Sequence, residues 1–241
     1  MYTKNMIREK YIDGEKVFYS DKIPELEHFF TTRSINVDDN FERVRKYLGL
    51  NKENFIHPTQ THSVNIEFSQ IGKTDYPETD GVILTNKEQG VYMRFADCTP
   101  VILYDKRANV AGIVHAGWRG TVGKIAVKGA EKILNYTRSK KSDIYAVIGA
   151  SIGACCYKVG QEVVDGVKST LKDSGGVVIE KSDGVYVDLK LINSRQLIEF
   201  GVPKENIDIC LFCTSCNNEL FYSYRKENGT VKRHNAVIKL Q

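Results

Sequence analysis

The segment Pro100-Val-Ile-Leu-Tyr104-Asp-Lys-Arg-Ala-Asn109-Val-Ala-Gly-Ile-Val-His115 contains two short apolar runs separated by a polar turn. Residues 100–104 and 110–115 are apolar at both odd and even positions, a pattern typical of strands whose sheet is covered on both faces. Asp105 begins the turn, where aspartate is favoured because its side chain bonds the following backbone. The segment therefore predicts two adjacent strands in a sheet that is packed on both sides.

The pairing of these two strands predicts a contact between a cysteine and a histidine. If Tyr104 pairs with Asn109, Cys98 lies directly opposite His115. Opposed residues have Cβ atoms about 4.5–5.5 Å apart. Zinc bonds to thiolate at about 2.3 Å and to imidazole at about 2.0 Å, so one ion could be shared across that gap. A bulge in either strand would break this register.

A catalytic zinc ion needs a third protein ligand, which must come from elsewhere in the fold. The chain has five histidines, namely His28, His57, His62, His115 and His234. His62 stands out because it opens a predicted strand and has polar neighbours. A histidine at a strand end is more often a surface or hydrogen-bonded residue, and a lone cysteine is more often a small buried hydrophobe. These residues by themselves therefore do not establish a metal site.

The segment Ala116-Gly-Trp-Arg-Gly-Thr121 follows the second strand and leads into a predicted helix. Its two glycines allow the backbone to approach a ligand closely, and Thr121 is suited to cap the helix. The helix N-terminus and Arg119 would together form an anion site near His115. Alternatively, Trp118 is a core residue and Arg119 an ordinary ion-pair partner, and the sequence alone supports both interpretations.

The remaining chain alternates between strand and helix patterns. Further strands are predicted at residues 16–20, 63–68, 81–85, 91–95, 143–149, 185–189, 207–212 and 236–240. Helices are predicted at residues 37–48, from near 121, from near 160, and from the N-cap Asp188 to 200. We therefore expect an α/β fold with mixed sheets inside and helices outside, in which residues 1–241 form a single domain.

Composition limits the classes of partner. The 241 residues include 34 basic and 30 acidic residues, and the net charge of +4 is spread along the chain. This charge is too weak to indicate a nucleic-acid partner, although it does not disfavour a small anionic substrate. The N-terminus has no apolar signal region and no apolar run approaches a membrane span. The expectation is a cytoplasmic protein with reduced thiols and no membrane partner.

The segment Cys210-Leu-Phe-Cys213-Thr-Ser-Cys216 is the most conspicuous group of cysteines. Three cysteines at this spacing would need a fourth ligand, and the nearby His234 matches no established zinc pattern with them. An unbroken strand would also point Cys210 and Cys213 to opposite faces. We therefore expect structural roles for these three cysteines, and the cysteine expected to matter most is Cys98.

Several segments, in the same order along the chain, resemble the YfiH-like proteins, also called the laccase-domain or polyphenol oxidase family. The matching segments span roughly residues 29–240. They are Thr59-Gln-Thr-His62-Ser, Thr79-Asp-Gly-Val, Ala96-Asp-Cys98-Thr-Pro, His115-Ala-Gly-Trp-Arg-Gly120, Ile148 to Tyr157, Cys213-Thr and Tyr222-Ser-Tyr-Arg225. The resemblance implies mixed sheets between outer helices, an α/β/β/α arrangement similar to the catalytic domain of cytotoxic necrotizing factor.

The resemblance also implies an activity and the residues that carry it. It implies that His62, Cys98 and His115 bind one zinc ion with an open position, and that copper can bind at the same site. The implied activities are phosphorolysis of adenosine, inosine and methylthioadenosine and deamination of adenosine, so the partners are purine nucleosides and phosphate. The candidate residues for substrate or phosphate binding are Arg33, Gln60, Asp80, Arg119 and Arg225. Asp97 lies in a matching motif, where a turn role is as plausible as a catalytic one.

Three other functions remain open at this point. A copper-dependent polyphenol oxidase, as in the family's older name, would need several copper centres rich in imidazole, and the chain has five histidines. A metal-free hydrolase or deamidase could use Cys98 as nucleophile and His115 as base. Such a dyad does not require His62, whereas a zinc site with three ligands does. A protein that binds nucleosides without turnover is the third alternative.

Overall fold

The computed structural model describes residues 7–241. Its helices are α1 (Val37–Tyr47), α2 (Trp118–Val122), α3 (Ile125–Thr137), α4 (Gln161–Lys168) and α5 (Leu189–Phe200). Its strands are β1 (Ile7–Ile12), β2 (Glu15–Ser20), β3 (Leu26–Thr31), β4 (Phe55–Ile56), β5 (Ile66–Phe68), β6 (Gly81–Leu84), β7 (Gly90–Phe95), β8 (Thr99–Asp105), β9 (Val110–Ala116), β10 (Ile144–Ile148), β11 (Lys158–Val159), β12 (Val178–Lys181), β13 (Gly184–Val187), β14 (Ile207–Ile209) and β15 (His234–Leu240). The predicted α/β class is confirmed.

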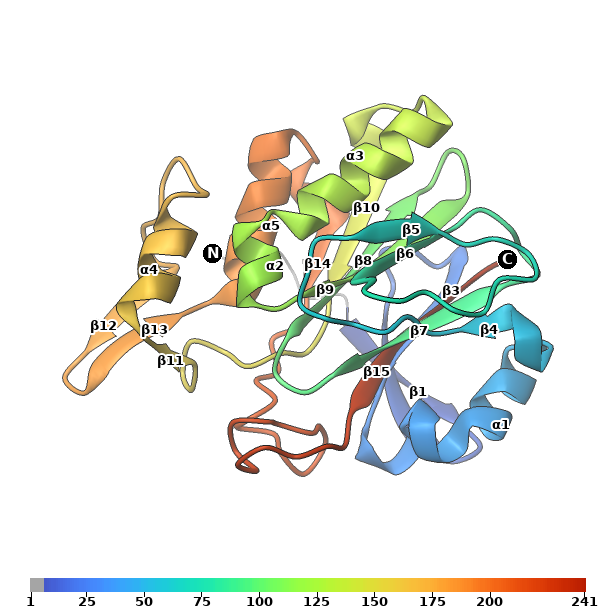
Figure 1. Ribbon diagram of the computed structural model, residues 1–241, viewed down its shortest axis with the longest axis horizontal. Helices are drawn as coiled ribbons and strands as arrows, with labels where there is room; N and C mark the ends of the chain where they lie inside the picture. Colours follow the sequence, from blue (N-terminus) through green and yellow to red (C-terminus); the bar gives the residue numbers. More distant parts are fainter. Residues whose placement is uncertain (1–6) are drawn as a thin grey trace.

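Two six-stranded sheets form the body of the molecule. The first has the strand order β1-β2-β3-β15-β7-β4 and the second has the order β14-β10-β8-β9-β6-β5. Both sheets are mixed, because β4 runs parallel to β7, β5 to β6, and β10 to β14, whereas the other neighbours are antiparallel. A small third sheet, β11-β13-β12, lies beside α4 at one end of the molecule (Figure 1).

The two large sheets pack face to face, and helices cover their outer faces. On β8, Ile102 and Tyr104 belong to the apolar core between the sheets, while Val101 and Leu103 pack with residues of α3 and α5. All seven residues of β8 are buried, as are all seven of β9. Helix α1 packs on the outer face of the first sheet, opposite α3 and α5 (Figure 1). Residues at both odd and even positions of these strands are thus apolar because both faces of the sheet are buried.

The predicted register between β8 and β9 is wrong by one residue on each strand. Asp105 pairs with Val110, and His115 pairs with Pro100 rather than with Cys98. The carboxylate of Asp105 accepts hydrogen bonds from the backbone N–H groups of Arg107 and Ala108, at 3.1 and 3.0 Å. The turn therefore occupies residues 106–109, and Asp105 remains in the strand.

The helix predicted from near Thr121 is two helices. The first, α2, begins at Trp118 after the N-cap Gly117, so Thr121 lies inside it and is not its cap. Lys124 then adopts a left-handed conformation with φ of 55°, and α3 begins at Ile125. The prediction for α5 is confirmed, since Asp188 accepts a hydrogen bond from the N–H of Leu191 as its N-cap.

Other differences concern strand lengths. Residues 63–65 form a loop, so β5 begins only at Ile66 and His62 does not open a strand. The strand predicted at residues 207–212 ends at Ile209. Strands β1, β3, β4, β11 and β12 were not predicted. Within residues 7–241, none of the helices combines the length and the apolar character needed to cross a lipid bilayer.

Candidate active site

Three side chains from distant parts of the sequence converge where the two loops before β5 and β8 meet the end of β9. His62, Cys98 and His115 each offer a ligand atom, and these atoms lie within 4.8 Å of one another. Cys98 lies two residues before Pro100, the partner of His115, so Cys98 is the diagonal neighbour of His115 on the same face. Its side chain can therefore still reach the imidazole. A Cβ atom on Gly117 would lie 3.1 Å from both Cys98 Sγ and His62 Cδ2, so a larger residue there would press on two of the three side chains.

One buried carboxylate orients both histidines. Asp80 Oδ1 accepts from Nδ1–H of His115 at 2.8 Å and from the backbone N–H of His62 at 3.0 Å. Its Oδ2 accepts from the backbone N–H groups of Thr61 and Ser63, at 3.0 and 2.8 Å. These bonds hold His62 in a left-handed conformation with φ of 62°, which is uncommon for a residue other than glycine. Because Nδ1–H of His115 donates to Asp80, Nε2 is the ring nitrogen that faces the cluster, and it can bind a metal ion once its proton is displaced.

The charges at the cluster favour a thiolate. Burial raises the pKa of Cys98, but the positive charge and hydrogen bonds of His115 and His62 outweigh it and bring the pKa down to about 6. Burial lowers the pKa of His115, but the Cys98 thiolate and Asp80 outweigh it and raise the pKa to about 9. Burial also opposes ionisation of Asp80, but hydrogen bonds from His115, Ser63 and Thr61 hold its pKa well below the usual range. Cys98 therefore has the charge that a metal ligand or a nucleophile needs.

The cluster lies on the wall of a cavity of about 560 Å³. This volume is in the range that small-molecule sites occupy. Three arginines line the cavity together with aromatic rings, namely Arg94, Arg225, Arg233, Tyr157, Tyr224 and His57. A second cavity of about 300 Å³ adjoins the cluster from another side, sharing His62 and Cys98 with the first and adding Trp118 and Arg119. The cluster is thus reached from two hollows of the surface.

Two of the predicted substrate residues line the larger cavity. The amide of Gln60 bonds both backbone groups of Arg94, donating to its carbonyl at 2.9 Å and accepting from its N–H at 2.8 Å. Arg225 donates to the carbonyl of Lys158 at 2.9 Å, a neutral partner that leaves its charge uncompensated by this contact. Arg119 lines the smaller cavity and stacks on Trp118 with its guanidinium 4.3 Å from the ring centre.

Two of the predicted substrate residues do not line either cavity at the cluster. Arg33 forms an ion pair with Glu227 and stacks at 4.3 Å on Tyr222, and it lines a hollow other than the one at the cluster. Its charge is already compensated, so it is not placed to hold a phosphate beside the cluster. Asp80 is fully buried and its carboxylate is occupied by the bonds described above, so it positions the histidines instead of contacting a substrate. Asp97 has a structural role of the same kind, since its carboxylate accepts from Thr214 Oγ1 and from the N–H of Arg225, both at 2.7 Å.

Several cavity residues were not predicted from the sequence. Arg94 lies in β7 and Arg233 directly before β15, and these strands pair so that His234 faces Phe95. Only this pairing brings the two arginines to one place. Tyr157 and Tyr224 lie in segments that resemble the family, but nothing in their local pattern indicates that they line a cavity.

Comparison with known proteins identifies the family. Residues 29–241 match the sequence model described as multi-copper polyphenol oxidoreductase laccase. This chain belongs to that family. The resemblance drawn from the sequence motifs is therefore confirmed.

The chain is similar along most of its length to named relatives and to a solved structure. The chain is 37% identical over 220 residues to purine nucleoside phosphorylase YlmD of Geobacillus stearothermophilus, covering 84% of this chain and 78% of the relative. It is 29% identical over 247 residues to adenosine deaminase RL5 of an unknown prokaryotic organism, covering 89% and 94%. The crystal structure of YlmD from Geobacillus stearothermophilus matches with a TM-score of 0.91 at 28% identity, covering 99% of this chain and 100% of that one.

Proposed function

We propose that this protein is a zinc-dependent purine nucleoside phosphorylase that acts on adenosine, inosine and methylthioadenosine and also deaminates adenosine. The observation that carries the proposal is the convergence of His62, Cys98 and His115 on the wall of a cavity that three arginines also line. A nucleoside and a phosphate together need such a combination of aromatic rings and cationic side chains. The names of two relatives, a purine nucleoside phosphorylase and an adenosine deaminase, support the same proposal.

The donor set fits one zinc ion. A thiolate and two imidazoles within 4.8 Å of one another match the ligand types of catalytic zinc sites, which keep one position open. Asp80 holds Nδ1 of His115, so Nε2 is the nitrogen directed to a metal ion, as is usual for histidines that bind metals, and binding displaces its proton. When bound there, zinc supplies a Lewis acid beside the substrate. Copper prefers similar nitrogen and sulfur donors and can bind the same three residues.

The remaining cavity residues have separate tasks in the proposed reaction. Phosphorolysis needs a phosphate held beside C1′ of the ribose, and Arg225 and Arg233 offer guanidinium groups for this purpose. Tyr157 and Tyr224 offer rings against which a purine can stack. The Arg94 side chain is already paired with Asp38 at 2.6 Å, and its backbone groups bond the amide of Gln60.

The multi-copper interpretation finds little support in the positions of the other histidines. His28 and His234 are buried in β3 and β15. Both ring nitrogens of His28 are occupied, since Nε2 accepts from the N–H of Ser20 at 3.0 Å and Nδ1 lies 2.8 Å from the carbonyl of Leu26. Among the described residues, two clusters are suited to hold a metal ion, and His62 and His115 of one cluster are the histidines they contain. Several copper centres rich in imidazole would need more.

A cysteine hydrolase is the second candidate, because the pKa of Cys98 is lowered to about 6 beside His115. The role of His62 separates the two candidates. A thiolate and imidazole pair retains its nucleophile and base when His62 is removed, whereas a zinc site loses one of its three ligands.

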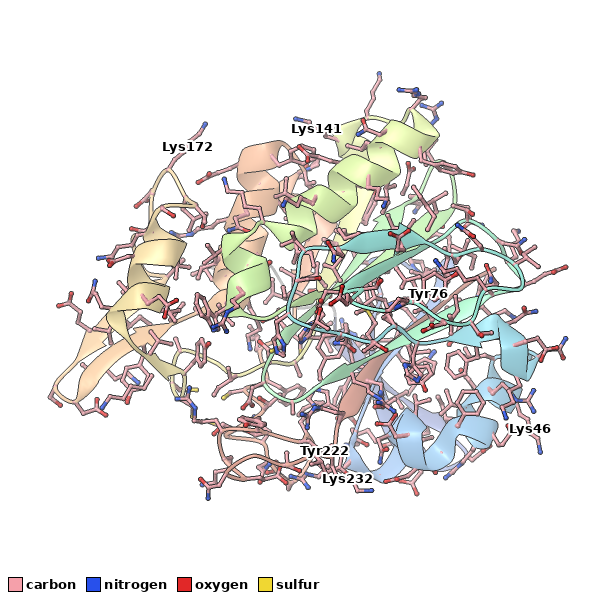
Figure 2. The ribbon with its side chains drawn as sticks, viewed as in Figure 1. Lys46, Tyr76, Lys141, Lys172, Tyr222 and Lys232 are labelled. Carbon is pink, nitrogen blue, oxygen red and sulfur yellow. The ribbon has the colours of Figure 1, made fainter. Side chains whose placement is uncertain are left out.

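Product analysis tests the proposal directly. The zinc-loaded protein is incubated with adenosine, with and without phosphate, and the products are separated by chromatography. We expect adenine and ribose-1-phosphate only with phosphate, and inosine in both cases. His62→Ala should lower both rates at least about 100-fold, since metal catalysis contributes several kcal/mol. Lys172→Ala serves as the control, because Lys172 points away from the protein in the loop after α4 (Figure 2). Undiminished turnover by His62→Ala would contradict the proposal.

A further inference from the structure

The structure brings together four cysteines outside the site described above. The sulfur atoms of Cys155, Cys156, Cys213 and Cys216 all lie within 4.8 Å of one another. The sequence alone predicts structural roles for Cys213 and Cys216, without a metal ion. That expectation considered Cys210 as their partner, which instead is buried in the core between the sheets. It overlooked the adjacent pair 155–156, which is about 60 residues away in the sequence and meets them only in the fold.

The distances between the sulfur atoms are those of donors around one ion. Cys216 Sγ lies 3.5 Å from Cys155 Sγ and 3.4 Å from Cys156 Sγ. A disulfide bond would be about 2.05 Å long. Four thiolates at about 2.3 Å from a tetrahedral zinc ion are about 3.8 Å apart. The cluster therefore has the size of a tetrahedral site for a single ion.

Two loops hold the sulfur atoms in this arrangement. Ser151 and Cys213 form a parallel bridge, in which the N–H of Thr214 donates to the carbonyl of Ser151 at 3.1 Å. The N–H of Gly153 donates to Cys213 Sγ at 3.2 Å, a contact that is common at metal-bound thiolates. A Cβ atom on Gly153 would lie 3.2 Å from Cys155 Sγ and 3.3 Å from Cys213 Cβ, so the backbone at Gly153 passes close to two of the four cysteines.

Packing of apolar side chains does not account for the cluster. Cys155 and Cys216 are exposed, although free cysteines are usually small buried hydrophobes. Lys181 Nζ donates to the carbonyl of Cys155 at 3.1 Å, which places a positive charge where a site of four thiolates has excess negative charge. Donor sets of sulfur alone in a tetrahedral arrangement select zinc or iron.

We propose that Cys155, Cys156, Cys213 and Cys216 bind one structural zinc ion, at a site separate from the one formed by His62, Cys98 and His115. All four coordination positions are filled by protein, so no position is open for a substrate. Binding converts the four thiols to thiolates and releases their protons to solvent.

The ion ties together the loops that form the wall of the active-site cavity. Tyr157 follows Cys156 directly and lines both cavities at the active site. The N–H of Ile152 donates to the carbonyl of Asp97 at 3.0 Å, and Thr214 Oγ1 donates to its carboxylate at 2.7 Å. Both loops of the zinc site are therefore bonded to the residue that precedes Cys98. Loss of this ion should loosen the cavity without removing a ligand of the other site.

Metal counting on variants tests the proposal. The full chain is purified under reducing conditions, loaded with zinc, passed over a desalting column and measured by plasma mass spectrometry. Cys216→Ser should bind one zinc ion fewer per chain than the wild type, and Cys216→Ser with His62→Ala should bind one fewer than His62→Ala alone. The zinc content of each Cys216→Ser variant is compared with that of the same protein carrying Cys216. The result therefore does not depend on whether the proposed active-site zinc exists. Cys210→Ala is the matched control and should bind as much zinc as the wild type.

A second measurement on the wild-type protein needs no variant. Alkylation at each cysteine is followed by peptide mass spectrometry, and the exposed Cys155 and Cys216 should react slowly with zinc bound and at least about ten times faster after a chelator is added. Equal zinc content in Cys216→Ser and its parent would overturn the proposal. Fast alkylation of both cysteines in zinc-loaded protein, iron in place of zinc, or a disulfide among the four cysteines under reducing conditions would each overturn it as well.

Discussion

Asp80 shows how one buried side chain sets the geometry of the candidate active site. Its carboxylate accepts hydrogen bonds from the ring of His115 and from the backbone of His62, which are 53 positions apart in the sequence. It also holds the backbone of Thr61 and Ser63. A carboxylate is suited to this task because it only accepts, and each of its bonding partners here is a donor.

Asp80→Asn should therefore weaken zinc binding while leaving the fold intact. The amide keeps the shape, but its NH₂ group cannot accept from the N–H groups of Thr61 and Ser63. We expect zinc affinity to fall about 10-fold to 100-fold, as for other residues that orient metal ligands. Affinity is measured by competition with a chromophoric chelator, and circular dichroism monitors the fold. Asp75→Asn makes the same change at an exposed position in the preceding loop and should bind zinc like the wild type. Equal affinities for both variants would show that Asp80 does not position the ligands.

At the scale of elements, the link between β2 and β3 depends on a side chain as well as on the backbone. The two strands pair only at Val17 with Thr31 and at Phe18 with Phe30. Beyond this pairing, Nε2 of His28 accepts from the N–H of Ser20. Burial, more than any other influence, lowers the pKa of His28 from 6.5 to about 4, because the charged imidazole would be desolvated. Protonation would also remove the lone pair that Ser20 needs.

His28 should make the protein sensitive to mild acid. Above pH 6.5 the imidazole is neutral in the folded and unfolded chains alike. Below pH 6.5 the unfolded chain binds a proton that the folded chain does not bind until about pH 4, so stability falls. Between pH 7 and pH 5, the free energy of unfolding should fall about 2 kcal/mol more in the wild type than in His28→Gln. Urea denaturation at each pH measures this difference. Between pH 8 and pH 7 the two proteins should change equally, and equal changes down to pH 5 would contradict the assignment.

At the scale of the whole molecule, the two sheets approach each other closely at Gly149. This glycine follows β10 of the second sheet, and Phe30 belongs to β3 of the first sheet. A Cβ atom on Gly149 would overlap the ring of Phe30 and would lie 2.7 Å from Cγ of Pro100. Both neighbours are buried. The close packing of the two sheets therefore favours glycine at position 149.

Gly149→Ala should destabilise the protein by about 2 kcal/mol, since overpacking of a dense core costs about 1–3 kcal/mol. The melting temperature should fall by roughly 5 °C for a protein of this size. Gly160→Ala is the control, because a Cβ atom there would meet nothing within 4 Å. The control should lose less than about 1 kcal/mol. Scanning calorimetry compares the two variants, and equal melting temperatures would mean that the sheets are not in close contact at Gly149.

The sequence by itself determined the features that depend on neighbouring residues. The two buried strands around Asp105, the N-cap at Asp188 and the motifs that show the family were all readable, because periodicity, capping and motif spacing are local. The edge strand β1 was missed because its inner residues are mostly exposed and show no apolar alternation. The predicted register of β8 and β9 was wrong because register depends on which residues of the turn are left unpaired. Asp105 bonds the turn with its side chain and stays paired with Val110.

Tertiary structure decided what meets at the two clusters of candidate metal ligands. His62 reaches Cys98 and His115 only because the buried Asp80 holds its loop in a left-handed turn. Arg33 has the right charge for a phosphate, but Glu227 neutralises it elsewhere. Nothing in the sequence links the pair 155–156 to Cys213 and Cys216, but the fold brings their four sulfur atoms within 4.8 Å of one another. Contacts of this kind depend on how whole sheets and loops pack, and no local pattern encodes a distance between residues far apart in the chain.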